Sequence, residues 1–341
     1  MGVVLATSRS FSSGTLDLVA RIEAAGHTVV EGSSDHDLTD LRPRLADAVG
    51  WIAGTGPVTA EHLAAAPGLR ILARYGVGFE AVDVAAASAL GIVVTNTPGA
   101  NSDAVADHAV GLMLAVLRGT VDGDRRVRSG DWSVVRGREL GSLTVGVVGF
   151  GRIGQGVARR LSGFGARILA HDPWLTDAQI TVTGAVPATL ADIADADLVT
   201  LHAPGGVRIV DEDWLAGVRP GIVLVNTARP DLVDETALAR ALSSGLVAGF
   251  AADTLEGDTR GGSSPLLDPA LADRVVVTPH LGAQTVEAVD NMGAIAVDNT
   301  IAVLAGRPPL NPVPGSFAPR GTASLHDPAA PTAPTDEGTL P

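Results

Sequence analysis

The sequence contains no cysteine and no lysine, so all 24 of its basic residues are arginine. Without cysteine, the chain has no disulfide bonds, no cysteine nucleophile and no thiolate ligands for a metal ion. Without lysine, it has neither a Schiff-base lysine nor the lysine of a phosphate-binding P-loop. Aromatic residues make up only 3% of the chain. We therefore expect a core of Ala, Val, Leu and Ile, and we predict no metal site.

The chain also has an excess of negative charge and lacks long apolar runs. Its formal net charge of −14 argues against a large contact with a phosphate backbone, so nucleic acid is not an expected partner. Gly, Asp or Arg interrupts every apolar stretch well before the length of about 18 residues that a membrane-spanning helix needs. The N-terminal run has neither the basic flank nor the cleavage site of a signal peptide. These absences together predict a cytoplasmic location.

What the sequence does contain is a repeated alternation of short β-branched runs and Ala-rich amphipathic stretches. With 341 residues and 46% hydrophobic content, the chain is long enough for about two globular domains. Strands that alternate with helices predict parallel sheets with helical crossovers. The pattern occurs both before and after residue 145, so we predict an α/β protein with two such domains. The expected strands are Val3–Ala6, Val29–Val30, Trp51–Ala53, Ile71–Ala73, Val145–Val148, Ile168–His171, Leu198–Leu201, Ile222–Asn226, Val247–Ala252 and Val275–Thr278.

Two long helical patterns and a proline-rich end complete the organisation. Ser102–Leu117 lies between the two sets of strands, and Thr285–Leu304 follows the last strand. If the second helix returns to the first domain, that domain is discontinuous, and helices of this length can act as hinges. Nine of the 21 prolines lie between Pro308 and Pro341. This composition predicts a disordered tail over residues 316–341.

A glycine-rich turn, Gly149-Phe150-Gly151-Arg152-Ile153-Gly154, directly follows a predicted strand and opens a predicted helix. The first glycine permits a tight turn, the second lets the backbone approach a pyrophosphate, and the third lets helix and strand pack closely. The phosphates then lie against free N–H groups at the positive end of the helix. Asp172 ends the next strand, 18 residues after Gly154, where a carboxylate accepts hydrogen bonds from ribose hydroxyls. The pattern predicts a dinucleotide site.

Asp172 also bears on the choice of dinucleotide. A carboxylate at this position repels the 2′-phosphate of NADP, whereas a nearby arginine attracts it. The next two residues, Pro173 and Trp174, are not basic. We therefore predict that the cofactor is NAD.

A bound nicotinamide implies hydride transfer, and a hydroxyl-to-carbonyl reaction also moves a proton. Such a site needs an acid/base near pH 7 and a cation for an anionic substrate, which histidine and arginine supply best. His280, Arg229 and Asp253 each follow a predicted strand. In a doubly wound sheet these strand ends face the ligand. We therefore predict that all three residues lie at the active site.

Five blocks, in this order, resemble the D-isomer-specific 2-hydroxyacid dehydrogenase family over nearly the whole chain up to about Pro314. They are Arg74-Tyr75-Gly76-Val77-Gly78 with Asp83, Asn96-Thr97-Pro98-Gly99-Ala100-Asn101, the glycine-rich turn, Asn226-Thr227-Ala228-Arg229, and Thr278-Pro279-His280-Leu281-Gly282-Ala283. The branch that looks nearest is phosphoglycerate dehydrogenase, in a short form without a regulatory domain. The resemblance implies an NAD-dependent oxidoreductase that interconverts a small D-2-hydroxy acid and its 2-keto acid, with D-3-phosphoglycerate as one candidate.

The resemblance also implies a role for each matching residue. Arg229 matches the arginine that holds the substrate carboxylate, and His280 matches the acid/base. For Arg74 and Asn101, a structural role such as a helix cap fits the sequence equally well. Residues that match substrate contacts are Arg74, Val77, Gly78 and Asn101, and those that match cofactor contacts are Gly149, Gly151, Arg152, Ile153, Gly154, Asp172, Ala203, Pro204, Thr227, Ala228, Asp253 and Gly282.

The family places a glutamate beside the catalytic histidine, five residues after the acid that contacts the nicotinamide. Counted from Asp253, that position holds Asp258, which is one methylene shorter than glutamate. Glu256 has the usual length but lies only three residues after Asp253. Glycines in this loop would let either side chain approach His280. We predict Asp258 as the partner of His280, with Glu256 as the alternative.

The architecture that the resemblance implies is a pair of Rossmann-like or flavodoxin-like domains with the active site in the cleft between them. Residues 1–99 and 286–315 would form the substrate domain, and residues 100–285 the NAD-binding domain. Family members usually dimerise through the NAD-binding domain. In this chain the segment Arg118–Leu140, which contains Trp132, is either the arm exchanged in a homodimer or a solvated loop.

Three features depart from the family pattern. Pro230-Asp231 stands where a glycine usually follows the catalytic arginine, and the loop after His202-Ala203-Pro204 looks shorter than usual. Phe79-Glu80-Ala81 stands where Tyr-Asp-Asn is common. Each change would alter substrate choice without altering the chemistry.

Two other functions compete with the dehydrogenase. Formate or phosphite oxidation would use the same scaffold, but the phosphite type carries a lysine in the cradle, and this chain has none. The formate type carries a glutamine where the carboxylate partner of the histidine is expected. A non-enzymatic alternative is an NAD-sensing binding module of the corepressor type, which would bind NADH and reduce no keto acid.

Overall fold

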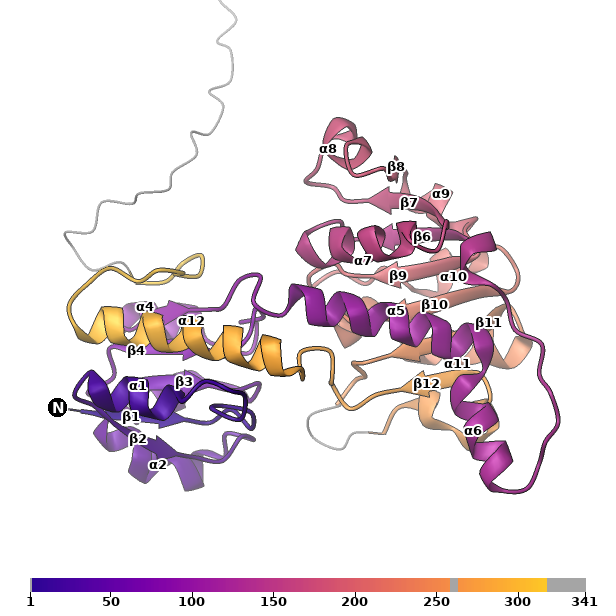
Figure 1. The fold of residues 1–341 in the computed structure, drawn as a ribbon. Helices are drawn as coiled ribbons and strands as arrows, with labels where there is room; N and C mark the ends of the chain where they lie inside the picture. Colours follow the sequence, from indigo (N-terminus) through magenta and orange to yellow (C-terminus); the bar gives the residue numbers. More distant parts are fainter. Residues whose placement is uncertain (1, 258–262, 318–341) are drawn as a thin grey trace, which may run out of the picture.

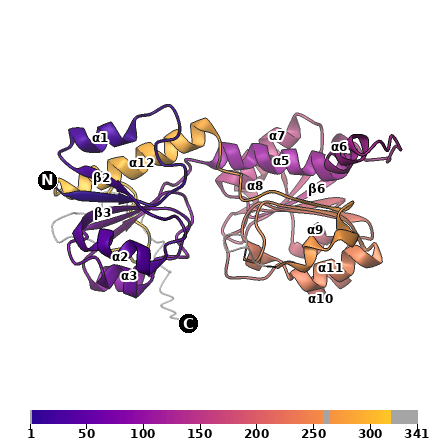
Figure 2. The same ribbon diagram turned by 90° about the horizontal axis from the view of Figure 1, so that it is seen from below.

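The structure, a computed structural model, describes residues 2–257 and 263–317 and contains two β-sheets whose strands are all parallel (Figure 1). The first sheet is formed by strands between residues 3 and 95, and the second by strands between residues 144 and 277. The two sheets belong to separate bodies that lie side by side in both views (Figures 1 and 2). The predicted α/β fold class with two parallel sheets is confirmed.

The first sheet has five strands in the order β2-β1-β3-β4-β5. The order reverses between β1 and β3, and such a switch point is where open α/β sheets bind ligands. The bounds are β1 (Val3–Ala6), β2 (Thr28–Glu31), β3 (Ala48–Ala53), β4 (Ile71–Arg74) and β5 (Val93–Thr95).

Helices cover both faces of the first sheet (Figure 2). Aliphatic side chains fill the two interfaces, and Trp51 is the largest side chain that is fully buried there. One face carries α1 (Leu18–Ala24) and α12 (Val286–Leu304), and the other carries α2 (Leu38–Asp47), α3 (Ala60–Ala64) and α4 (Val84–Ala89).

The second sheet has seven strands in the order β12-β11-β10-β9-β6-β7-β8. Its order reverses between β6 and β9, which is the arrangement of a doubly wound dinucleotide-binding sheet. The bounds are β6 (Thr144–Val148), β7 (Arg167–His171), β8 (Val186–Pro187), β9 (Leu198–Leu201), β10 (Ile222–Asn226), β11 (Val247–Ala252) and β12 (Val275–Val277).

Helices also cover both faces of the second sheet (Figure 2). One face carries α5 (Ser102–Arg118), α7 (Arg152–Ser162) and α8 (Asp177–Thr181), and the other carries α9 (Leu190–Ala194), α10 (Glu212–Ala216) and α11 (Glu235–Ser244). α6 (Thr120–Arg128) follows α5, and short 3-10 turns are η1 (Leu140–Ser142), η2 (Pro230–Leu232), η3 (Pro265–Leu267) and η4 (Pro269–Leu271).

The last helix returns to the first sheet, as the sequence predicts. The hydroxyl of Tyr75 donates to the carbonyl oxygen of Val289 at 2.8 Å. Arg70, at the start of β4, donates to the carbonyl oxygens of Val303 and Leu304 at 2.9 and 3.0 Å. These bonds fasten both ends of α12 to the first domain, which makes that domain discontinuous. The exact boundaries, residues 1–99 with 286–315 and residues 100–285, stay predictions.

The segment Arg118–Leu140 is helical in its first part and irregular in its second. It contains α6, and residues 129–139 then run without helix or strand to η1. In this second part Trp132 is 77% exposed, and Val134 and Val135 are exposed as well. The segment therefore presents apolar side chains to its surroundings in the single chain.

Within the described part of the chain, no single helix has both the length and the apolar composition to cross a membrane. Only α5 and α6 taken together reach that length and composition, and a bend of 59° separates them. Most of the apolar side chains of α5 are buried against the second sheet.

The two residues that open the predicted tail contact the first domain. The backbone N–H of Val94 donates to Oγ of Ser316 at 2.8 Å, and Phe317 packs against the core that α12 covers. Residues 318–341, the rest of the predicted tail, lie outside the described residues. The contacts at Ser316 and Phe317 place these two residues with the first domain.

Two truncated chains test this boundary. A chain that ends at Phe317 keeps both contacts, so we expect its melting temperature to match that of the full chain. A chain that ends at Gly315 loses one hydrogen bond and part of an aromatic contact, worth about 1–2 kcal/mol. At about 2–4 °C per kcal/mol for domains of this size, its melting temperature should fall by several degrees. Thermal denaturation measures this, and equal melting temperatures for the two truncated chains would contradict it.

Candidate active site

The candidate residues lie on loops that leave the carboxyl ends of parallel strands. Arg229 follows β10, Asp253 follows β11 and His280 follows β12, so three neighbouring strands of the second sheet supply them. Val77 and Gly78 follow β4 of the first sheet. Open α/β sheets bind their ligands at this end of the strands.

The glycine-rich turn between β6 and α7 depends on close backbone approaches. Gly149 has a φ of 85°, and a Cβ there would lie 2.5 Å from backbone atoms of His202 and Ala203, just beyond β9. A Cβ on Gly154 would overlap with the carbonyl oxygen of Gly149. Neither position has room for a side chain, because the turn brings the ends of β6 and β9 and the first turn of α7 together.

The N-terminus of α7 has room in front of it. Its N-cap residue Gly151 provides no side-chain cap, and the first turn, which begins with Arg152 and Ile153, contains no acidic residue. A Cβ on Gly151 would meet no atom within 4 Å. Free N–H groups at a helix N-terminus with open space before them suit an anion such as a pyrophosphate. This end of α7 therefore fits a dinucleotide.

Asp172 connects the end of β7 to the glycine-rich turn. Its Oδ2 accepts a hydrogen bond from the N–H of Phe150 at 2.7 Å, and its Oδ1 accepts one from the N–H of Trp174 at 2.9 Å. The side chain is only half-buried. The carboxylate is thus held in one orientation beside the turn, at the place where a ribose is expected.

The other cofactor candidates lie on loops after β9, β10 and β12. Thr227 is buried, and its hydroxyl has no hydrogen-bond partner among the described residues. Ala228 donates its N–H to Oδ1 of Asn226 at 3.0 Å, which closes the turn after β10. Ala203 and Pro204 follow β9 beside Gly149. A buried hydroxyl without a partner is available to a bound molecule, so Thr227 also fits the cofactor.

The loop after β4 directs three consecutive carbonyl groups toward the protein. Gly76, whose φ of 143° favours glycine, Val77 and Gly78 each have their carbonyl oxygen bonded. The donors are Thr97 N at 3.0 Å, Asn96 Nδ2 at 2.7 Å and Arg74 Nε at 2.9 Å, respectively. Within the described residues, the N–H groups of Val77 and Gly78 donate to no hydrogen-bond acceptor. Two adjacent donors are therefore available to an anion.

Arg74 is a buried positive charge behind this loop. Arg74 is only 6% exposed, and it forms no ion pair with any carboxylate of the described residues. Burial lowers the pKa of Arg74 to about 10, although the charge of Glu80 opposes this shift. The guanidinium stays protonated at neutral pH, so it adds positive potential at the cradle formed by Val77 and Gly78.

Asn101 occupies the N-cap position of α5 but does not cap the helix with its side chain. Its Oδ1 is buried and has no hydrogen-bond partner among the residues that the structure describes. The side-chain cap that offered a structural explanation for Asn101 is therefore not formed.

Arg229 reaches from the second sheet to the loop of the first sheet. Its Nη1 donates to the carbonyl oxygen of Ala228 at 2.8 Å, and its Nη2 donates to the two carboxylate oxygens of Glu80 at 3.2 and 3.3 Å. A Cβ on Gly78 would overlap with Nη2 of Arg229. The guanidinium therefore lies against Gly78 of the cradle. Its contact with Glu80 was not predicted from the sequence.

Two departures from the family pattern contact each other beside Arg229. Oδ2 of Asp231 accepts a hydrogen bond from the N–H of Gly206 at 2.6 Å, and a Cβ on Gly205 would lie 3.0 Å from Oδ1 of Asp231. The same Cβ would lie 3.4 Å from Cγ of Arg229. The short loop after β9 is thus fastened to the turn that carries Arg229.

Asp253 is a buried carboxylate with four donors. It is 2% exposed. Its oxygens accept hydrogen bonds from Oγ1 of Thr278 at 2.6 Å, Nε2 of His108 at 3.2 Å, and the N–H groups of Leu281 and Gly282, each at 2.7 Å. Burial alone raises the pKa of Asp253, but these hydrogen bonds outweigh it and hold the pKa below its usual range.

His280 lies between the residues that Asp253 binds. Its φ of 57° is in the left-handed region, which non-glycine residues rarely adopt. Thr278 before it and Leu281 after it both donate to Asp253, so the carboxylate fixes the loop on either side of the imidazole. His280 itself is exposed. Strained residues of this kind gather at functional sites, where the surrounding structure holds them.

Neither His108 nor Thr278 was predicted from the sequence to be part of this arrangement. His108 lies in the middle of α5, a helix whose other inward-facing residues are apolar. His108 is identified only by its hydrogen-bond contacts in the folded structure with Asp253 and Thr278, which lie 145 and 170 residues further along the sequence.

The carboxylate partner of His280 stays a prediction. Glu256 has an exposed side chain, and its backbone N–H donates to Oε1 of Glu235 at 2.7 Å. Asp258, the favoured partner, lies outside the described residues.

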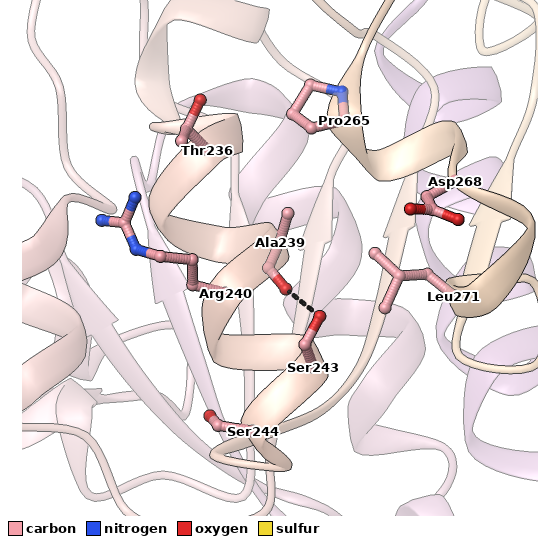
Figure 3. A pocket seen from close by; sticks show the side chains of 8 residues that line it. All are labelled: Thr236, Ala239, Arg240, Ser243, Ser244, Pro265, Asp268 and Leu271. Atoms are coloured by element: carbon pink, nitrogen blue, oxygen red, sulfur yellow. Dashed lines mark hydrogen bonds between the residues drawn. The ribbon is translucent and has the colours of Figure 1, made fainter.

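Two concave features lie away from these loops. A groove of about 540 Å³ lies between α11 and the turns η3 and η4, lined by side chains such as Arg240 and Asp268 (Figure 3). A second, of about 230 Å³, lies beside the ends of β1 and β2, around Arg9 and Phe11. In the described ranges, no three His, Asp or Glu side chains are grouped to hold a metal ion. None of the candidate residues lines either groove.

A comparison with protein families identifies the second domain. Residues 110–282 match the family described as D-isomer specific 2-hydroxyacid dehydrogenase, NAD binding domain. The chain belongs to this dehydrogenase family. The predicted resemblance is confirmed, and so is NAD as the cofactor of this domain. The matched residues include the glycine-rich turn, Arg229, Asp253 and His280.

Relatives of the dehydrogenase family match most of the chain. It is 42% identical over 257 residues to a D-3-phosphoglycerate dehydrogenase of Mycobacterium leprae, a match that covers 73% of this chain and 48% of that protein. It is 37% identical over 268 residues to a glyoxylate reductase of Thermofilum pendens, a match that covers 75% of this chain and 78% of that protein. The chain therefore spans about half the length of the phosphoglycerate dehydrogenases that it matches.

Solved structures of the family share both domains. The D-lactate dehydrogenase of Aquifex aeolicus, solved with NAD and lactic acid, superposes with a TM-score of 0.77 at 25% sequence identity. The superposition covers 89% of this chain and 96% of that one. The likeness therefore extends over the first sheet as well as the NAD-binding domain.

The hydrogen bonds of Asp253 predict a pH-dependent contribution to stability. The pKa of Asp253 is lower in the folded protein than in the unfolded chain, where it is about 3.9. The contribution to stability is therefore present above about pH 3.9 and is lost as the pH falls through the pKa of the folded state. Asp253→Asn should lower the free energy of unfolding by a constant amount between about pH 5 and 8.

Below about pH 4 the difference between wild type and Asp253→Asn should shrink. Urea denaturation of both proteins across this range measures it. Asp268→Asn, at an exposed aspartate that caps η4, is the control. A difference for Asp253→Asn that does not change with pH would contradict the account.

Proposed function

We propose that this protein is an NAD-dependent oxidoreductase that interconverts a small D-2-hydroxy acid and its 2-keto acid. The observation that carries the proposal is the position of Arg229, whose guanidinium lies against Gly78, in the loop where the N–H groups of Val77 and Gly78 are available. An arginine above a backbone anion cradle suits a substrate carboxylate. The relatives, which are named as dehydrogenases and reductases of such acids, support the same class of substrate.

In this mechanism Arg229 binds the substrate carboxylate, and the N–H groups of Val77 and Gly78 donate to the same group. The buried charge of Arg74 adds to the positive potential there. During reduction, protonated His280 donates its proton to the keto oxygen. In the reverse direction, neutral His280 removes the proton from the hydroxyl. When bound, the dinucleotide supplies or accepts the hydride. Asp253 is a positioning residue in this mechanism, because it holds the loop that carries His280.

The residues that would hold the dinucleotide form a continuous path along the second sheet. Gly151 and the first turn of α7, with Arg152 and Ile153, would bind the pyrophosphate, and Asp172 the adenosine ribose. Ala203, Pro204, Thr227, Ala228 and Gly282 would line the remainder of the path up to Asp253.

A panel of 2-keto acids with NADH tests the proposal directly. Glyoxylate, hydroxypyruvate, pyruvate and 3-phosphohydroxypyruvate cover the substrates that the relatives and the sequence suggest, including that of a phosphoglycerate dehydrogenase. We expect oxidation of NADH with at least one of them. Binding of NADH without turnover of any keto acid would favour the NAD-sensing binding module instead.

Arg229→Lys tests the role of the guanidinium. Lysine keeps the charge but loses the planar pair of donors, so kcat/KM for the keto acid should fall by more than about tenfold. The control is Arg240→Lys, at an exposed arginine on α11 that pairs with Glu212. Near-normal kcat/KM in Arg229→Lys would remove Arg229 from the site.

Asp172 predicts the preference for NADH over NADPH. Wild type should reduce the keto acid with a higher kcat/KM for NADH, because the carboxylate repels a 2′-phosphate. Asp172→Asn keeps the size of the side chain and removes its charge, so the ratio of the two kcat/KM values should fall by about tenfold. Equal rates with both cofactors in wild type would refute the proposed role of Asp172.

The pH–rate profile tests the partner of His280. A carboxylate within hydrogen-bond distance favours the protonated form of a histidine, so its removal should move the alkaline fall in keto-acid reduction to lower pH. We expect this shift in Asp258→Asn and not in Glu256→Gln. A shift in Glu256→Gln alone would make Glu256 the partner, and no shift in either would mean that neither carboxylate assists His280.

The proposal includes a homodimer formed through the NAD-binding domain and a cytoplasmic location. The exposed apolar side chains of residues 129–139, led by Trp132, support an arm that packs on a second chain. Light scattering should give the mass of two chains.

A further inference from the structure

The carboxylate of Glu80 lies where the proposed function places the carboxylate of the substrate. Both of its oxygens are within 3.3 Å of Nη2 of Arg229. A Cβ on Gly78 would lie 2.7 Å from Oε2 of Glu80, so the same carboxylate also lies against the cradle backbone. The side chain is half-exposed and its loop leaves the first sheet, whereas Arg229 leaves the second. The carboxylate of Glu80 thus occupies the proposed anion subsite of its own chain.

The charges around this subsite are balanced before a substrate arrives. Arg74 and Arg229 contribute two positive charges, of which Arg74 is buried. Glu80 contributes one negative charge, and Asp231, beside Arg229, contributes another. A second anionic group on a substrate would need a further cation beside these four groups. The balance therefore suits a substrate with a single negative charge.

We propose that Glu80 is a specificity-determining residue, which competes with the substrate carboxylate for Arg229 and selects 2-keto acids with one negative charge over those with two or more. The inference rests on the proposed function, because it takes the Arg229 subsite as the place of the substrate carboxylate. Once a substrate displaces it, Glu80 remains on the loop of Gly78, two residues away. Its charge then faces the incoming molecule, and a second anionic group is repelled.

This selection separates the substrates that the relatives suggest. Glyoxylate and hydroxypyruvate carry one negative charge, whereas a phosphorylated keto acid carries more. The proposal therefore favours the unphosphorylated acids for this chain. Glu80 stands where aspartate is common in the family, so it keeps the negative charge and is one methylene longer, a length with which it reaches Nη2 of Arg229.

Oxamate and oxalate provide a matched pair of ligands, because they have nearly the same shape and carry one and two negative charges. Their dissociation constants are measured by titration calorimetry on the NADH-loaded protein, as wild type and as Glu80→Gln. Glutamine can still accept a hydrogen bond from Arg229, so the variant removes the charge and keeps the contact. We expect oxamate to bind about threefold more tightly to the variant and oxalate about tenfold more tightly, since the second charge adds a further Coulomb repulsion.

The matched control is Glu212→Gln, which removes the charge from an exposed glutamate on α10 that pairs with Arg240 on α11. It should leave both dissociation constants unchanged. In keto-acid reduction, Glu80→Gln should lower KM for glyoxylate while kcat changes by less than about twofold.

The outcomes separate the two proposals. Equal dissociation constants in wild type and Glu80→Gln, for both ligands, would overturn the role of Glu80 and leave the proposed function intact. Equal gains for oxamate and oxalate would overturn charge selection. If neither ligand binds to either NADH-loaded protein, Arg229 does not form a carboxylate subsite, and the proposed function fails with the inference.

Discussion

The site depends on one constraint, which is that the carboxyl ends of two separate parallel sheets lie within reach of a single side chain. Arg229 leaves β10 and contacts the loop after β4 through Glu80, 149 residues away in the sequence. A half-exposed ion pair of this kind contributes only about 0–1 kcal/mol, so it does not by itself hold the domains together. Its importance is positional, because it brings a guanidinium of the second domain against Gly78 in the loop of the first.

The site also depends on a buried charge that organises a loop. Asp253 is almost fully buried, and four hydrogen bonds compensate for its loss of water. Two of its donors are consecutive backbone N–H groups just after His280, and a third is Thr278 just before it. The left-handed conformation of His280 is therefore stabilised by a neighbour on another strand. This explains how a strained residue can be held at a defined place on an exposed loop.

The sequence predicts the sheets well because buried parallel strands are short β-branched runs. β1, β9, β10 and β11 begin and end at the predicted residues, whereas β5 and β8, with three and two residues, are too short to give such a pattern. The residue types of the site also follow from strand ends and from the family resemblance. Contacts across the chain do not follow from either. Glu80 on Arg229, His108 on Asp253 and Asp231 on Gly206 depend on how distant loops meet, and no local pattern encodes that.

The most direct test of the account is a crystal structure of the protein with NADH and oxamate. The carboxylate of oxamate should contact Arg229 and the N–H groups of Val77 and Gly78, with Glu80 displaced from Nη2 and the imidazole of His280 beside the carbonyl oxygen. Oxamate bound elsewhere, with the Glu80–Arg229 ion pair intact, would contradict the central claim that this arginine holds the substrate carboxylate.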